Sequence, residues 1–294
     1  MNLTTIKSIL QETLAAWQED KVPILAAALA YYMVFSLAPL LVIVIAIAGF
    51  IVGEAAAQEE VVDKITKVMG EQGAEVIQNV IQTQFEPSSS IIATAIGIVT
   101  LIFAATTIFA QLKQALNIIW GVELKPGQGI WGFIRSRILA IFMVLGIGFI
   151  LLLSLIVSSV LSGLSDWLGQ VLPVPTLVWS VTDNTITFIL ITLLFGQIYR
   201  VLPDIKIAWA DVGVGAAITA VLFIIGRTLI ALYLGNAGVA SAYGAASSFI
   251  VLLLWIFYSA QIFLLGAELT KIWTRRYGSQ IRPNSNAVLV DDNN

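Results

Sequence analysis

The sequence predicts an all-α membrane protein, a polytopic bundle of six transmembrane helices with both ends of the chain in the cytoplasm. Amphipathic interfacial helices are expected at the N-terminus and in the first external loop. Charged residues make up only 11% of the 294 residues, whereas a typical soluble domain has about 25%. Six apolar stretches are long enough to cross a bilayer. The basic residues gather on one side of the predicted bundle, and this fixes its orientation.

The first segment, residues 1–20, is predicted to form an amphipathic helix. Its apolar side chains recur at helical spacing: Leu3, Ile6, Leu10, Leu14 and Trp17. This pattern is typical of a helix lying in the membrane interface; packing on other cytoplasmic loops is an open alternative. Asp20 is the expected N-cap of the next helix, with Pro23 in its first turn.

The chain is organised around residues 26–52, which hold no charged residue. A helix of this length is about 40 Å long and crosses a ~30 Å hydrocarbon core. Its first half also carries Tyr32, Ser36 and Pro39. Because Pro39 leaves a backbone carbonyl without its helical donor, this half is expected to face protein or water rather than lipid.

The polar connection over residues 53–89 is expected to form two short amphipathic helices that cover the mouth of the bundle, because apolar residues recur in it at helical spacing. Five further spans are predicted over residues 90–112, 138–162, 178–201, 210–233 and 245–271. Residues 21–274 therefore form the transmembrane domain. Residues 275–294 form a polar cytoplasmic tail, expected to be disordered from residue 282 onward.

The basic residues predict the orientation of the bundle. With the N-terminus inside, twelve of the 15 lie on the cytoplasmic side. They are Lys7, Lys21, Lys113, Lys125, Arg135, Arg137, Arg200, Lys206, Lys271, Arg275, Arg276 and Arg282.

Four phrases in order resemble the YihY/BrkB family of bacterial inner-membrane proteins, over nearly the whole chain. They are AAALAYYMVFSLAPLL around residues 27–41, FAQLKQALNIIWGV at 109–122, YRVLPDIKIAWADVGVGAAI at 199–218 and SAYGAASSFIVLLLWIFYSAQIFLLGAEL at 241–269. The resemblance implies a multi-pass, six-helix protein of the bacterial cytoplasmic membrane. The family once carried the label ribonuclease BN and is linked with envelope properties such as serum resistance. Transport of a lipid or envelope component is a leading proposal for it.

Composition argues against the ribonuclease label and against an enzyme in general. The chain has no histidine and no cysteine, which removes the commonest metal ligands and general bases. The cytoplasmic acids outside the termini are spread over three loops and helix ends, so they predict no two-metal site. The net charge of −3 argues against nucleic acid as a partner, and no cofactor is expected.

Two charged residues within spans are candidates for a substrate pathway or gate. Arg227 is the only basic residue away from the ends of a predicted span; it contacts an anionic headgroup, or it snorkels to the interface or pairs with Asp183. Glu268 opposes the dipole of its helix. It forms a structural ion pair with Lys271, Lys113 or Arg200, or it acts as a gate or proton-coupling acid.

The remaining candidates for the pathway are uncharged, apart from Arg200, whose simplest role is cytoplasmic anchoring. They are Tyr32, Ser36 and Pro39 in the first span, Thr107, Gln111, Gln114 and Asn117 in a polar stripe, and Tyr243 and Gly244 before the last span. Hydrogen-bonded packing between helices is the alternative role for these residues.

These features predict a transporter or translocation component for a lipid or another amphipathic envelope molecule. The chain has no nucleotide-binding P-loop, so the energy would come from a gradient or a partner. The alternative is a non-catalytic membrane scaffold that binds an envelope protein. Membrane lipids are the expected partners in either case, and a homo-oligomer is open.

Overall fold

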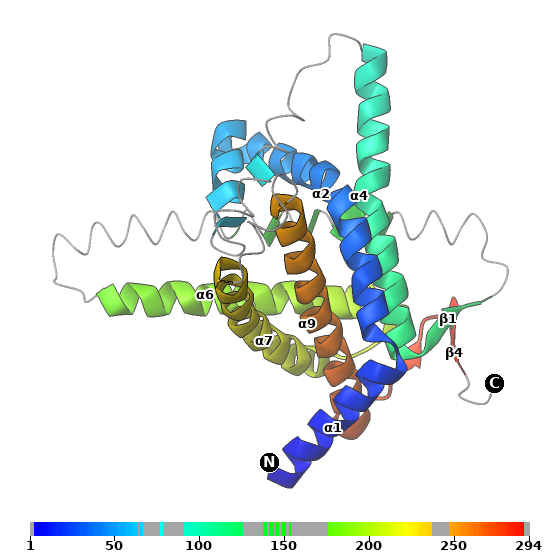
Figure 1. The fold of residues 1–294 in the computed structure, drawn as a ribbon. Helices are drawn as coiled ribbons and strands as arrows, with labels where there is room; N and C mark the ends of the chain where they lie inside the picture. The colour runs from blue at the N-terminus through cyan, green and yellow to red at the C-terminus, as the bar shows by residue number, and fades with distance from the viewer. Residues whose placement is uncertain are drawn as a thin grey trace.

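The structure is a computed structural model. It describes residues 3–63, 65–66, 77–78, 91–125, 138–139, 141–143, 145–146, 149–150, 153, 176–236 and 247–290. Most of the predicted third span, part of the connection over residues 53–89, and both Tyr243 and Gly244 lie outside these residues. Long helices dominate the described part of the chain (Figure 1). Their bounds are α1 Leu3–Glu19, α2 Val22–Val52, α4 Ile91–Trp120, α6 Thr176–Val201, α7 Trp209–Asn236 and α9 Ser247–Tyr277.

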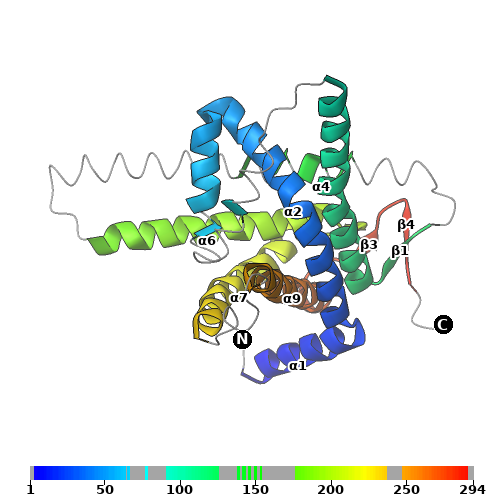
Figure 2. The ribbon, with the colours of Figure 1, turned by 45° about the horizontal axis from the view of Figure 1, so that its top comes forward.

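Three of these helices are long and apolar enough to cross a membrane: Val22–Phe50 in α2, Trp209–Ile230 in α7 and Phe249–Tyr277 in α9. α6 contributes a shorter apolar stretch, Thr185–Val201, and runs crosswise to α4 in both views (Figures 1 and 2). The structure thus agrees with a mostly helical membrane protein, and the six-span topology stays a prediction.

Helix α1 lies across one end of α9 (Figure 2). Ile9 and Thr13 are buried, whereas Ile6, Leu10 and Leu14 are exposed. The prediction that Asp20 caps the next helix is wrong: the cap position of α2 is Lys21, in a left-handed conformation with φ of 51° and no side-chain capping bond. Pro23 does lie in the first turn of α2, and the helix continues through Pro39.

Helix α9 is the centre of the described bundle because it packs against α1, α2, α4 and α7. The most extensive apolar cluster among the described residues joins α2, α4, α6, α7 and α9, and contains the rings of Trp120, Phe195, Tyr199 and Phe263. Glycines let α7 and α9 approach closely: a Cβ atom at Gly215 would lie 1.9 Å from Oγ1 of Thr270.

The C-terminal residues return to the bundle in extended form (Figure 2). Strand β4, Ala287–Leu289, pairs antiparallel with β1, Val122–Leu124, which follows α4. Strand β3, Arg282–Pro283, pairs with β2, Ile205–Lys206, which follows α6. The expectation of a disordered tail is therefore wrong for residues 282–290. Backbone pairing with two loops gives this polar segment the partners that its composition does not reveal.

Candidate functional site

Polar and charged contacts gather at one end of the bundle. At this end α2 and α7 begin and α4, α6 and α9 finish, and strands β1 and β4 lie beside the end of α4 (Figure 1). Two clusters of buried charge lie there, one around Asp204 and one around Glu268.

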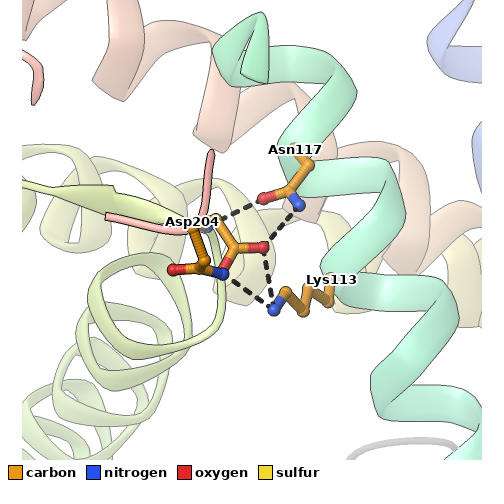
Figure 3. Close-up of polar contacts among 4 residues, drawn as sticks. Lys113, Asn117 and Asp204 are labelled. Carbon is orange, nitrogen blue, oxygen red and sulfur yellow. Dashed lines mark hydrogen bonds and ion pairs between the residues drawn. The ribbon is translucent and has the colours of Figure 1, made fainter. Parts of the chain in front are cut away.

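The first cluster centres on Asp204, in the turn between α6 and β2 (Figure 3). Lys113 of α4 donates to its carboxylate, with Nζ 2.8 Å from Oδ2. Asn117, one turn further along α4, donates to Oδ2 at 3.0 Å and accepts from the Asp204 backbone N–H at 2.8 Å. Asn286 of the tail donates to Oδ1 at 3.2 Å. One carboxylate thus joins α4, the α6–β2 turn and the tail.

These donors set the ionisation of Asp204, which is only 3% exposed. Burial alone would raise the pKa of the carboxyl. The hydrogen bonds from Lys113, Asn117 and Asn286, together with the charge of Lys113, outweigh burial and hold the pKa below its usual value. The cluster is therefore a buried ion pair whose carboxylate also accepts hydrogen bonds from Asn117 and Asn286, an arrangement typical of a structural lock.

The second cluster places two carboxylates around one ammonium. Lys271 Nζ lies 3.2 Å from Oε2 of Glu268 and 3.0 Å from Oδ2 of Asp20. Glu268 is fully buried within a membrane-length helix, and its Oε1 has no hydrogen-bond partner in the described part of the chain. A buried carboxylate with one unsatisfied oxygen is costly, so this cluster is the candidate for a functional role.

The contact between Glu268 and Lys271 that the sequence predicts is present. The two other predicted partners are occupied elsewhere: Lys113 binds Asp204, and the guanidinium of Arg200 lies 4.3 Å from the ring centre of Trp209. The stacking fits the expected anchoring role of Arg200.

The polar stripe of α4 does not line one common space. Asn117 belongs to the Asp204 cluster, whereas Gln114 is exposed and Gln111 half-buried. Thr107 donates to the backbone carbonyl of Phe103 at 2.9 Å. In α2, Ser36 is buried, and Tyr32 and Pro39 are half-buried.

Arg227 is half-buried in α7. It forms no ion pair or hydrogen bond with any residue that the structure describes. The side chain of Asp183, its predicted partner, lies outside the described set.

Sequence reasoning missed Asp204, Asn286 and Asp20 as site residues. All three lie in turns or in the tail, where no helical spacing ties a residue to its partner. For Asp204, the one signal in the sequence is Pro203, which predicts a break in the helix directly before it.

The sequence of this chain is similar to those of a known protein family. A family model described as "Virulence factor BrkB" matches residues 13–289. The chain belongs to this family. The resemblance of the four sequence phrases to the BrkB family is thereby confirmed, and with it an integral membrane protein. No solved structure matches the chain.

Relatives of this BrkB family protein are themselves named as UPF0761 membrane proteins. One from Mannheimia succiniciproducens is 28% identical over 92% of this chain and 91% of its own length. Relatives from Pseudomonas aeruginosa and Neisseria meningitidis serogroup B are each 27% identical, over 87% and 90% of this chain. The chain spans only 62% and 63% of these two relatives. None of the three names states an activity.

Among the described residues of this BrkB protein, no three histidine, cysteine, aspartate or glutamate side chains lie close enough to hold a metal ion. The described contacts at the charged end are ion pairs and hydrogen bonds between helices, turns and the tail.

Proposed function

We propose that this BrkB family protein spans the bacterial cytoplasmic membrane six times, with the charged end and both termini in the cytoplasm. The support is the gathering of Lys113, Arg200, Lys271, Arg275 and Arg276 at one end of the described helices. Cytoplasmic loops carry an excess of such residues.

Within this placement, we propose that the protein moves a lipid or another amphipathic envelope molecule across the membrane. The observation that carries the proposal is the fully buried Glu268, which shares the ammonium of Lys271 with Asp20 in the turn between α1 and α2. The Lys271–Asp20 contact ties α9 to this turn, so its loss would free the inner ends of α9 and α2. Glu268 competes with Asp20 for the same ammonium from within α9. An ionisable residue in such a position is a functional candidate by default.

Buried apolar side chains pack between the inner ends of the described helices, as a closed inner end requires. Opening requires that Lys271 exchange its partners, either through protonation of a carboxylate or through an arriving charged cargo. The same packed core also suits the alternative function, a scaffold that holds an envelope protein partner through its outer surface.

A flux measurement separates the two functions. The purified protein is reconstituted into liposomes with a fluorescent phospholipid, with and without a proton gradient. We expect lipid movement with the unaltered protein and a large loss in Glu268→Gln and Asp20→Asn, because each removes one partner of Lys271. Glu54→Gln is the matched control, since Glu54 is exposed and, among the residues that the structure describes, its carboxylate accepts a hydrogen bond from Gln58.

Absence of movement by the unaltered protein under every gradient would overturn the transport proposal and favour the scaffold. Full movement by Glu268→Gln and Asp20→Asn would show instead that the Lys271 cluster is structural.

A further inference from the structure

An open groove lies between α1 and α9 at the charged end. Its volume is about 310 Å³, and its walls include Ala15 and Ala16 of α1 and Ile272 of α9. The two alanines leave room between the helices because their side chains end at Cβ. The volume is at the lower end of the range for small-ligand pockets, roughly 300–1,000 Å³, and so suits one compact polar group.

Most of the charges around this groove neutralise one another. Arg276 forms an ion pair with Glu12 across the two helices and donates to Oγ of Ser8 at 2.6 Å. Lys271 is held by Asp20 and Glu268. These contacts hold α1 against α9 and engage the charged groups of Glu12, Lys271 and Arg276.

Two other charged side chains of the groove differ from these in having no partner in the described part of the chain. Glu19 of α1 and Arg275 of α9 both line it and are exposed. Neither forms an ion pair or hydrogen bond with a residue in the described part of the chain. The groove therefore presents one free carboxylate and one free guanidinium on two different helices, which is complementary to a ligand that carries both an anionic and a cationic group.

The surroundings of the groove indicate a lipid. It lies where the membrane-length stretch Phe249–Tyr277 ends, at the level expected for headgroups. The exposed side chains of Ile6, Leu10 and Leu14 on α1 add an apolar face. That face suits acyl chains, for which the groove itself has no room.

We infer that the α1–α9 groove binds the headgroup of an aminophospholipid, a phosphodiester with a primary ammonium. Arg275 contacts the phosphate through its planar pair of N–H donors, and Glu19 accepts from the ammonium. The inference rests on the membrane placement of the proposed function and does not require transport. An anionic lipid without an amine satisfies only Arg275 and leaves the carboxylate of Glu19 next to uncompensated negative charge.

Native mass spectrometry of the purified full chain in detergent tests the inference. The protein is titrated with dioleoyl phosphatidylethanolamine or dioleoyl phosphatidylglycerol, and the bound fraction is measured. We expect the unaltered protein to prefer phosphatidylethanolamine by about fivefold, in line with one exposed charge contact. Arg275→Gln should lower the affinity for both lipids about fivefold. Glu19→Gln should weaken phosphatidylethanolamine binding, raise phosphatidylglycerol binding by removing a like charge, and bring the preference close to one.

Two exposed charges outside the groove provide matched controls, Glu54→Gln and Arg282→Gln, and neither should change the preference. Equal binding of the two lipids by the unaltered protein would overturn the inference. So would an Arg275→Gln or Glu19→Gln variant with unaltered binding. Because this measurement involves no flux, its failure leaves the transport proposal standing, and absence of lipid flux leaves the binding site standing.

Discussion

At the scale of single residues, Asp204 makes the most polar contacts among the described residues of the charged end. Its carboxylate is the one acceptor that Lys113, Asn117 and Asn286 share, and it is 3% exposed. Removing one partner from a buried ion pair strands the other charge, which costs about 3 kcal/mol. Asp204→Asn keeps the shape and removes the charge, so we expect it to lower the free energy of unfolding by about that amount at neutral pH.

The pH dependence of this variant gives a sharper measurement. The folded protein holds the pKa of Asp204 below its usual value, so the charged carboxylate stabilises the fold above the unfolded pKa of about 3.9. This contribution is lost as the pH falls through the lowered folded pKa. Thermal unfolding is followed by tryptophan fluorescence. The difference in unfolding temperature between the unaltered protein and Asp204→Asn should stay constant from pH 7 to 5 and become smaller below about pH 4.

Glu123→Gln provides the control, because Glu123 lies exposed on the neighbouring strand β1. It should leave the unfolding temperature unchanged. An equal loss of unfolding temperature in Glu123→Gln would contradict the assignment of Asp204 as the buried structural lock. So would a difference between the unaltered protein and Asp204→Asn that does not become smaller in acid.

At the scale of elements, close packing of α7 on α9 depends on glycine. A Cβ atom at Gly215 would lie 1.9 Å from Oγ1 of the fully buried Thr270. At Gly213 in the same helix a Cβ atom would meet nothing within 4 Å. We expect Gly215→Ala to destabilise the fold by about 1–3 kcal/mol through overpacking, measured as unfolding temperature in detergent. Gly213→Ala should be neutral or slightly stabilising, because alanine favours a helix. Equal effects at both positions would contradict the described α7–α9 contact.

The helices differ in how well the sequence could predict them. Apolar runs located α2, α7 and α9, because a membrane requires long segments without charge. Hydropathy did not predict where α4 ends. The expected span stops at residue 112, before Lys113, but the helix continues to Trp120 because its last turns are held by the core and by the Asp204 cluster.

The short strands and the candidate site were harder to predict because their partners lie far apart in the sequence. Val122 pairs with Leu289 and Ile205 with Pro283, and each segment alone is too short to carry a strand pattern. Glu268 and Lys271 are three residues apart on one helix, so the sequence could predict their contact. Asp20 is 251 residues from Lys271, and only the tertiary structure brings them together.

At the scale of the whole molecule, we propose that hydrocarbon surrounds a bundle whose charged end faces the cytoplasm. The proposed gate at Lys271 and the proposed headgroup groove between α1 and α9 both depend on this orientation. The chain contains no cysteine, so any introduced cysteine is the sole thiol and reports the side of the membrane on which it lies.

The most direct measurement is labelling of Glu54→Cys and Glu123→Cys by a membrane-impermeant maleimide in intact cells. Both positions are exposed; Glu54 follows the far end of α2, and Glu123 lies at the charged end. We predict labelling of the Glu54→Cys protein in intact cells, and labelling of the Glu123→Cys protein only after the inner membrane is permeabilised. Labelling of the Glu123→Cys protein in intact cells, or the same accessibility for both proteins, would contradict the account.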